Sequence, residues 1–385
     1  MTPVAMAGVS FLERGNMRVE IHQIADEELD SFVNFPFELY KNDPYWVGEL
    51  KADTKKLLRL NNVFWTKNER ALFMAYQDGK AVGRIAAILN KEHNEYHHEN
   101  IGFFGFFDVI NDRNVAAALF QAAEDWLRAK GVTAVRGPAN PDSNHIYGLL
   151  ADGFDSMPAI MMPYNYPYYM ELIEQAGYGK IKDLLAFERS KDDKFSERFL
   201  KVCARCSRGH GITLRRLNLK NLEAEAEIIR EIYNKAWAEN WGFVPMSKQE
   251  MADVVNELKL IVRPEGTCVL EVDGVAAGFY IAIPNMNHAL KELKGSLANP
   301  WRIIKALLAW RKIKDARLIM LGVAPEFRKR GIDLILIKHI IDHGVAVWNE
   351  AELSWVLEDN DGIIRGITEC GCHTSKRYRL YQKSL

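Results

Sequence analysis

Three basic residues precede a glycine at Arg328, Lys329, Arg330 and Gly331, and an apolar helical pattern follows them. The segment reads LGVAPEFRKRGIDLILIKHII, residues 321–341. A helix that begins near residue 331 leaves its first backbone N–H groups without intrahelical partners and carries partial positive charge at that end. Glycine lets the backbone approach an anion closely, and the basic side chains add charge there. The spacing indicates a pyrophosphate site, with a solvated basic helix start as the alternative.

An acidic residue, Asp333, lies in the first turn of the same predicted helix. A carboxylate there satisfies the amides and the dipole that a phosphate would use. A like charge about 4 Å away costs on the order of 1–4 kcal/mol, depending on the local dielectric. Asp333 is therefore either a helix cap that points outward or a sign that anion binding has weakened.

The elements that must position this loop are expected twice along the chain. The segment DGKAVGRIAAI, residues 78–88, aligns without gaps with DGVAAGFYIAI, residues 273–283, and each indicates an Asp-Gly turn followed by a strand. In each half the pattern is a strand, helices, three strands, a long helix, a strand, a helix and one or more final strands. The chain therefore contains an internal repeat.

This order predicts an α/β (α+β) fold with two tandem domains, each a mixed twisted sheet flanked by helices on both faces. We expect a disordered tail over residues 1–16, a first domain over 17–190, a linker with a helix over 191–211 and a second domain over 212–385. The turn of the first half, GFFGFFDVINDRN, carries Asp108 and Asp112 in place of the basic run. We expect the first domain to be a scaffold that binds no phosphate.

The second half resembles the GNAT superfamily of acyl-CoA N-acyltransferases. In the family pattern, Val-x-Pro is followed by Arg or Gln, two residues, Gly, one residue and a small residue, and an Asn and a Gly follow the next strand. The matching residues, with Asp333 replacing the small residue, are Val323, Pro325, Arg328, Gly331, Asn360 and Gly371. More loosely, the whole chain resembles a little-characterised bacterial group with two tandem GNAT-like domains, through GFFGFFD, NWGFVP, ELSWVLEDN and KRYRLY.

The resemblance implies that the first domain is a degenerate GNAT-like domain and that the second binds acyl-CoA, with acetyl or longer acyl groups, as co-substrate. The residues implied to contact it are Leu321, Val323, Arg328, Lys329, Arg330, Gly331, Ile332, Asp333 and Asn360.

The resemblance also implies that an amine attacks the thioester directly. This reaction needs a donor that polarises the carbonyl, a base that receives the amine proton and an acid that protonates the leaving thiolate. A backbone N–H near residues 321–323 is the implied donor. The candidate base is Glu358, with Glu352 as a second choice on the same strand, and an exposed strand-edge glutamate is the alternative for either.

The position that would supply the acid differs from the family pattern. Many members carry a Tyr seven residues after the Asn, but Ile367 occupies that position here. Tyr378 and Tyr381 on the last strand are the candidates to replace it, with Cys370 and His373 as further options. An aliphatic thiolate is also a fair leaving group, so an acid is not obligatory.

Two segments bear on the acceptor. Four aromatic residues could form an apolar substrate pocket, although ordinary packing under a loop explains them as well: Trp237, Trp241, Phe243 and Trp355. Residues 300–314 form a basic amphipathic helix, which could contact a membrane peripherally or cover a tunnel for a lipid chain. A surface helix packed on the core is the alternative.

Composition narrows the function classes. The 385 residues contain 50 Lys and Arg against 51 Asp and Glu, so no net field attracts nucleic acid. No apolar run reaches the length of a membrane span, and no secretory leader opens the chain, so we expect a cytoplasmic protein. The five cysteines include one CxxC, Cys203 and Cys206, without a second pair of that spacing, and we expect no metal site.

These observations favour an N-acyltransferase that transfers an acyl group from acyl-CoA to a small-molecule or lipid-like amine. A non-catalytic binding or scaffold protein of the same fold is one alternative. A long-chain N-acyltransferase that acts on a lipid-like amine, with acyl carrier protein as a possible donor, is another.

Overall fold

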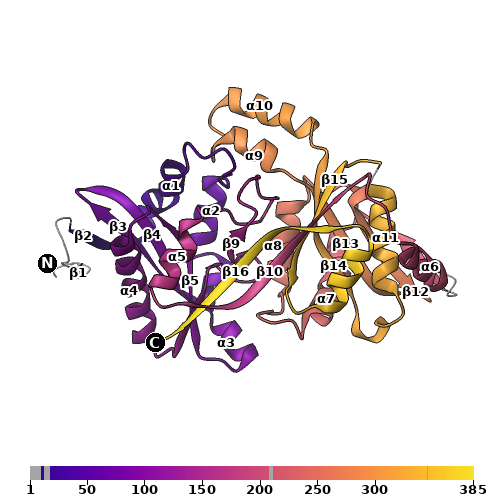
Figure 1. Ribbon diagram of the computed structural model, residues 1–385, viewed down its shortest axis with the longest axis horizontal. Helices are drawn as coiled ribbons and strands as arrows, with labels where there is room; N and C mark the ends of the chain where they lie inside the picture. The colour runs from indigo at the N-terminus through magenta and orange to yellow at the C-terminus, as the bar shows by residue number, and fades with distance from the viewer. Residues whose placement is uncertain (1–9, 13–17, 208–210, 345) are drawn as a thin grey trace. The chain divides into compact units, whose positions relative to one another are not determined.

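The computed structural model describes residues 10–12, 18–207, 211–344 and 346–385. The chain forms two compact units, each assembled from several segments (Figure 1). Unit 1 contains Met1–Asp183, Ala289–Ala306 and Tyr378–Leu385, and unit 2 contains Leu184–His288 and Leu307–Arg377. Most of the tail predicted over residues 1–16 lies outside the described residues.

The sheet of unit 1 has the strand order β1-β2-β3-β4-β5-β6-β16. Its pairs are antiparallel except β5 and β6, which run parallel. Residues 381–384 of β16 pair with β6, so the last strand of the chain joins this sheet, and β9 pairs with β16 as well. The strands are β1 (Ser10–Leu12), β2 (Val19–Ile24), β3 (Glu69–Gln77), β4 (Lys80–Leu89), β5 (Ile101–Val109), β6 (Ala134–Gly137) and β16 (His373–Ser384).

Helices cover both faces of this sheet. A Cβ on Gly83 of β4 would lie 2.7 Å from Leu119 Cδ1 of α4, whereas the next residue, Arg84, donates to the carbonyl of Phe32 on α1 at 2.7 Å. Successive strand residues point to opposite faces, so α4 and α1 lie on opposite sides. The remaining elements complete the unit or, for β10, continue into unit 2: α1 (Leu29–Leu39), α2 (Lys51–Leu58), α3 (Lys91–His97), α4 (Arg113–Ala129), β7 (Ala139–Asn140), β8 (Ile146–Tyr147), β9 (Leu149–Asp152), α5 (Tyr168–Gln175) and β10 (Gly179–Ser190).

The sheet of unit 2 has the strand order β10-β15-β14-β13-β12-β11, with β14 and β15 parallel and the other pairs antiparallel. The strands are β11 (Ile212–Arg215), β12 (Thr267–Val272), β13 (Val275–Pro284), β14 (Asp315–Val323) and β15 (Glu350–Leu357). The helices that follow α5 in the chain are α6 (Glu197–Cys206), α7 (Leu222–Trp237), α8 (Lys248–Leu258), α9 (Asn287–Leu293), α10 (Pro300–Arg311), α11 (Ile332–Gly344) and α12 (Asp361–Glu369). Among the described helices, none combines the length and apolarity that a bilayer-spanning helix needs.

The internal repeat predicted from the sequence is confirmed at the level of single glycines. Gly278 of β13 aligns with Gly83 of β4, and a Cβ on Gly278 would lie 3.0 Å from Leu336 Cδ1 of α11. Both residues of the Asp-Gly turn before each strand have positive φ. The values are 49° at Asp78 and 73° at Gly79 in the first turn, and 51° at Asp273 and 79° at Gly274 in the second. The mixed α/β fold with helices on both faces of each sheet is therefore present twice.

In each unit the parallel pair of strands stays paired over only part of its length. In unit 2 the pairing runs from Asp315↔Glu350 to Leu318↔Leu353, while β14 continues to Val323. Against β13 the register skips one residue, Ile319, and such a bulge bends a strand. In unit 1 the pairing of β5 with β6 likewise ends at Phe103↔Arg136, although β5 continues to Val109.

Candidate functional site

The basic glycine loop lies between β14 and α11, as the sequence predicts. A short 3-10 turn, Pro325–Phe327, leads into Arg328–Gly331, and α11 begins at Ile332. Gly331 has φ +74°, and a Cβ there would lie 2.3 Å from Cys206 Sγ of α6. The loop therefore requires glycine at 331 both for its backbone conformation and for its packing against α6.

The three basic side chains of the loop are exposed and differ in their contacts. The guanidinium of Arg328 donates to the carbonyl oxygen of Ala236 at 2.5 Å and lies 3.9 Å from the Glu239 carboxylate, so it contacts the end of α7. The guanidinium carbon of Arg330 lies 5.4 Å from the centre of the Phe327 ring. Within the described chain, neither Lys329 nor Arg330 forms an ion pair. Two cations thus remain available beside the start of α11.

The amides of the first turn of α11 are not capped by its acidic residue. The amide of Ile335 donates to the carbonyl of Gly331 at 3.1 Å, which places the preceding amides ahead of the first intrahelical bond. Asp333 is half-buried, and its carboxylate accepts no hydrogen bond from the described residues. These amides, with the helix dipole, are a suitable environment for an anion.

The strand before the loop has one unpaired edge. Tyr280↔Leu321 and Gly278↔Val323 are pairs between β13 and β14, so the edge toward β13 is occupied. Beyond Leu318, no described strand pairs with the edge of β14 on the β15 side. Unpaired backbone N–H groups on this edge, within residues 319–323, are a source of the donor that a thioester carbonyl needs.

An aromatic cluster packs beside this end of β14. Phe243 is buried, and its ring centre lies 5.5 Å from that of Tyr233, which lies 4.6 Å from that of Trp237. A Cβ on Gly322 would lie 2.4 Å from Trp237 Cζ3, so the indole lies directly against the strand. The structure therefore brings Phe243 close to the end of β14 through Trp237, which the sequence analysis also names among the pocket residues.

The loop that carries Phe243 is held to α7 by one side chain. Asn234 Nδ2 donates to the carbonyl of Met246 at 2.9 Å, and the amide of Met246 donates to Asn234 Oδ1 at 2.9 Å. Sequence reasoning missed Asn234 because an Asn within a helical pattern carries no local signal of a partner twelve residues away. The other predicted pocket residues, Trp241 and Trp355, are half-buried in this loop and in β15.

The residues predicted at the end of β15 have different roles. Glu358 follows the strand and is half-buried. Asn360 is the N-cap of α12, and its Oδ1 accepts from the amide of Ile363 at 3.3 Å. Ile367 is buried in the core of unit 2, which leaves no polar group where the family pattern has tyrosine. Asn360 is therefore engaged within the protein as a helix cap, and the half-buried Glu358 remains the candidate base.

A buried polar cluster lies where β14 and β15 separate. Arg317 Nε donates to Ser354 Oγ at 2.9 Å, and Ser354 Oγ donates to the Glu352 carboxylate. Arg317 and Glu352 are also register partners one pair before the end of the parallel pairing. Burial raises the pKa of Glu352, while the charge of Arg317 opposes that shift. This arrangement fastens the two strands at their branch point.

The two candidate acids belong to unit 1 and not to the unit that contains the basic loop. Tyr378 and Tyr381 are fully buried in the last segment of the chain. The hydroxyl of Tyr381 donates to Glu174 Oε1 at 3.3 Å, and burial raises its pKa to about 12. Their role as acids stays a prediction.

Unit 1 closes the corresponding separation of its parallel strands with its own chain. The amide of Phe106 donates to Asn140 Oδ1 at 2.6 Å, and a Cβ on Gly105 would lie 1.7 Å from the carbonyl oxygen of Ala139. Strand β7 therefore occupies the edge of β5 whose counterpart on β14 is unpaired.

Two tyrosines cap the end of β5. The amide of Val109 donates to the hydroxyl of Tyr169 at 2.9 Å, and the hydroxyl of Tyr168 donates to the carbonyl of Val109 at 2.7 Å. These contacts occupy the backbone of Val109, and the turn that follows has one basic residue, Arg113, where unit 2 has three.

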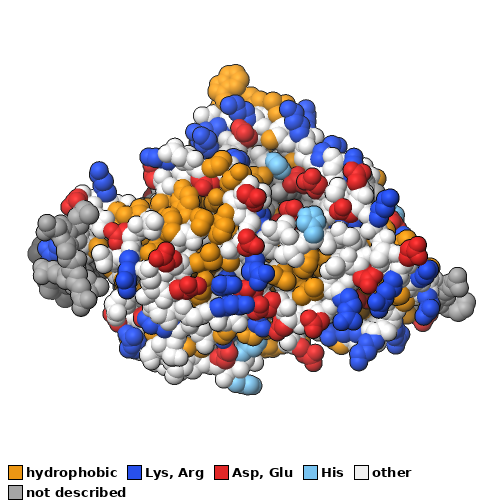
Figure 2. Space-filling model, in the orientation of Figure 1, with side chains coloured by type: hydrophobic (Ala, Val, Ile, Leu, Met, Phe, Trp, Pro, Cys, Tyr) orange, Lys and Arg blue, Asp and Glu red, His pale blue; other side chains and the backbone are white. Residues whose placement is uncertain are grey.

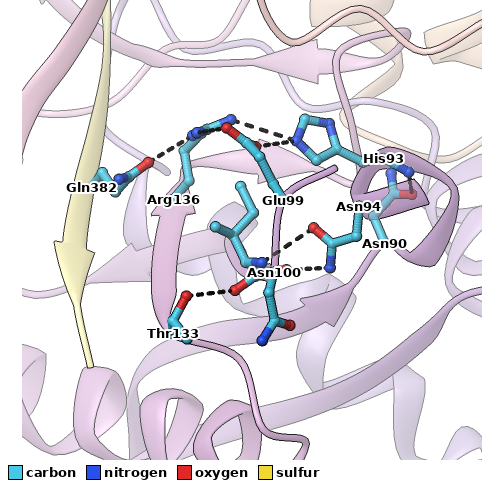
Figure 3. Close-up of polar contacts among 9 residues, drawn as sticks. Asn90, His93, Asn94, Glu99, Asn100, Thr133, Arg136 and Gln382 are labelled. Carbon is cyan, nitrogen blue, oxygen red and sulfur yellow. Dashed lines mark hydrogen bonds and ion pairs between the residues drawn. The ribbon is translucent and has the colours of Figure 1, made fainter. Parts of the chain in front are cut away.

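The polar cluster in Figure 3 holds elements of unit 1 together. Glu99 accepts from His93 Nε2 at 2.9 Å and from Arg136 at 3.0 Å, and Arg136 Nε donates to Gln382 Oε1 at 2.9 Å. His93 and Arg136 are buried, and desolvation lowers the pKa of His93 to about 4. The cluster ties α3 and β6 to the final strand. Among the described residues, no group of three or more His, Cys, Asp and Glu side chains could hold a metal ion.

The comparisons with known proteins agree with this arrangement. The family model described as "Acetyltransferase (GNAT) family" matches residues 21–150 and 226–371. The chain is 35% identical over 373 residues to Protein YghO of Escherichia coli (strain K12), covering 93% of each chain. It is 33% identical over 368 residues to Bacterial ceramide synthase of Caulobacter vibrioides (strain NA1000 / CB15N), covering 93% of this chain and 95% of the relative.

Among solved structures, the tandem GNAT protein from the clavulanic acid biosynthesis pathway superposes with a TM-score of 0.56 at 14% identity, covering 95% of this chain and 98% of that chain. At that identity the likeness concerns the fold alone. The family model matches both halves of the chain separately, as the internal repeat requires. The chain therefore belongs to the GNAT acetyltransferase family and contains the family's fold twice in tandem.

Proposed function

We propose that the chain is an N-acyltransferase whose unit 2 binds acyl-CoA and transfers its acyl group to an amine. In this proposal the pyrophosphate lies at the start of α11, where Lys329 and Arg330 and the first-turn amides neutralise its charge. The pantetheine and thioester then lie along residues 321–323 of β14. Asn360 stabilises the site as the N-cap of α12.

One observation carries the proposal. The edge of β14 beyond Leu318 has no strand partner among the described residues, and it ends in a basic glycine loop. Unit 1 has the same separation of parallel strands, but β7 and the tyrosines of α5 close it. The contrast supports one cofactor site per chain, in unit 2.

The reaction needs no group beyond those of the chain and its substrates. The lone pair of the amine attacks the thioester carbon, the C–N bond forms and the C–S bond breaks. A backbone N–H of β14 stabilises the oxyanion, Glu358 accepts the ammonium proton, and the thiolate receives a proton to give free CoA. We keep Tyr378 and Tyr381 as candidate acids, although a thiolate can also leave unprotonated.

The acceptor is proposed to be a lipid-like amine. The relative named Bacterial ceramide synthase is aligned over 93% of this chain. Ceramide is the N-acyl product of a long-chain amino alcohol, so such an acceptor fits an amine-directed acyltransferase. The aromatic cluster of Tyr233, Trp237 and Phe243 beside β14 supplies an apolar wall suited to an alkyl chain.

Turnover with matched donors and acceptors tests the proposal. The chain is incubated with acetyl-CoA, palmitoyl-CoA or palmitoyl-acyl carrier protein, and with sphinganine or butylamine. Free thiol and the amide product are measured together. We expect amide formation with sphinganine and an acyl-CoA. Thiol release without amide would indicate thioester hydrolysis and contradict transfer to an amine. No turnover of any pair would favour the non-catalytic alternative, in which Ile367 has replaced a catalytic tyrosine.

A further inference from the structure

Helix α10 exposes its apolar side chains to solvent. Twelve large hydrophobic side chains are exposed among the described residues, and five of them lie within residues 297–308: Leu297, Trp301, Ile304, Leu307 and Leu308. The exposed fraction of Trp301 is 74%. Exposed apolar residues are normally scattered singly over a soluble protein, so this clustering is unusual.

The apolar residues lie on the side of the helix that faces away from the protein. Trp301, Ile304 and Leu308 recur at helical spacing and are all exposed, whereas Ala306, on the opposite side, is buried. An ordinary surface helix places its apolar stripe against the core. Helix α10 instead packs through Ala306, with Ile303 and Trp310 half-buried, and presents its other large apolar residues outward. We call Leu297, Trp301, Ile304, Leu307 and Leu308 the α10 stripe.

The charged side chains of α10 and of the three residues after it all have one sign. Residues 300–314 contain Arg302, Lys305, Arg311, Lys312 and Lys314 and no acidic residue. Four of these five are exposed, with Arg302 half-buried. Figure 2 shows hydrophobic side chains gathered over α10 with Lys and Arg side chains beside them. A surface that combines outward apolar side chains with flanking cations complements the interface of an anionic lipid bilayer.

We infer that the α10 stripe docks on an anionic phospholipid surface, with the helix axis parallel to the membrane plane. The apolar side chains enter the boundary between headgroups and acyl chains, and Lys305, Arg311 and Lys312 contact lipid phosphates. This inference concerns a surface outside the proposed acyl-transfer site. It stands or falls without any catalytic activity.

Vesicle cosedimentation of the full chain, without substrates, tests the inference. We expect binding to vesicles of phosphatidylglycerol and phosphatidylcholine (1:1) and at least tenfold weaker binding to pure phosphatidylcholine. Lys305→Gln with Arg311→Gln removes two cations, and each is worth about a fivefold change in partitioning at an anionic surface. Trp301→Ser with Leu308→Ser is expected to abolish binding to both vesicle types.

The matched control is Leu260→Ser, because Leu260 is 75% exposed and the nearest other exposed large apolar residue in the sequence is Val275. It is expected to bind vesicles like the unchanged chain. Each variant is first checked for an unchanged unfolding midpoint. Quenching of tryptophan fluorescence by brominated lipid gives a second readout, and the component due to Trp301 is expected to be lost in Trp301→Phe.

Three results would overturn the inference. The first is absence of vesicle binding by the unchanged chain, and the second is equal loss in Leu260→Ser and in the Trp301 and Leu308 double variant. The third is a chain that does not bind vesicles but forms a dimer or binds an acidic acyl carrier protein, where the Trp301 and Leu308 double variant abolishes that association. That result would assign the α10 stripe to a protein partner.

Discussion

Replacing Gly331 with alanine perturbs the proposed phosphate loop at its most constrained point. Gly331 has φ +74°, a region that costs an L-residue about 1–2 kcal/mol. The new Cβ would also lie 2.3 Å from Cys206 Sγ and 3.0 Å from Cys206 Cβ, so α6 or the loop must move. Overpacking of this kind costs about 1–3 kcal/mol. We expect Gly331→Ala to lower the free energy of unfolding by about 2–5 kcal/mol.

A double variant separates the two contributions. Cys206→Ala removes the sulfur that the new Cβ meets, so Gly331→Ala in that background is expected to recover the overpacking part and keep the cost of positive φ. Gly366→Ala is the matched control, because Gly366 lies within α12 and its nearest contact, Leu334 Cδ2 at 3.5 Å, is ordinary packing. Alanine there is expected to stabilise the helix by about 0.5–1 kcal/mol.

Urea unfolding and calorimetric titration with CoA provide the two measurements. Gly331→Ala is expected to lower both the unfolding midpoint and the affinity for CoA, while Gly366→Ala lowers neither. If Gly331→Ala unfolds and binds CoA like Gly366→Ala, the loop geometry described here does not govern the site, and the reasoning is refuted.

Four further variants test other parts of the account. The pKa of His93 is lowered to about 4 from an ordinary 6.5, so the unfolded chain binds the additional proton. The free energy of unfolding should therefore fall by about 1.4 kcal/mol per pH unit as the pH drops below 6.5, and this fall should level off near pH 4. In thermal melts, His93→Gln should reduce this pH dependence, and an unchanged dependence would contradict the prediction. Tyr169→Phe strands the amide of Val109 and should cost about 1–3 kcal/mol in urea unfolding, whereas no loss would mean the cap is dispensable. Glu358→Gln should lower kcat by about 10²–10⁴-fold, while Glu352→Gln leaves kcat of the folded protein unchanged; the opposite ranking would make Glu352 the base.

Local sequence patterns predict most of the fold. The repeated Asp-Gly turn, with the strand that follows it, identifies two copies of the same unit. The turn requires positive φ, and glycine at positions 83 and 278 leaves space for a helix to pack closely on the strand. The strand, basic glycine loop and helix around Gly331 were also predicted, since their order depends on residues close in sequence. The family prediction and the fold class are confirmed by the comparisons.

Long-range contacts account for what the sequence could not predict. Residues 378–385, including both candidate acids, belong to unit 1 because β16 pairs with β6, and no local pattern encodes a pairing across about 250 residues. The contact of Arg328 with the carbonyl of Ala236 is likewise invisible in sequence. Periodicity identified the apolar stripe of α10, but periodicity does not say whether a stripe faces the core or the solvent. The acid, the base and the acceptor stay predictions.

The stoichiometry of CoA binding tests the central claim most directly. Calorimetric titration of the full chain with CoA is expected to give one site per chain, because unit 1 closes its own strand edge and lacks the basic loop. The double variant Lys329→Glu with Arg330→Glu is expected to lower the affinity for CoA at least tenfold. The control is Lys182→Glu with Lys294→Glu, which changes the net charge by the same amount elsewhere in the chain. One site that depends on Lys329 and Arg330 is the predicted result. No binding, two sites per chain, or one site indifferent to these residues would contradict the account.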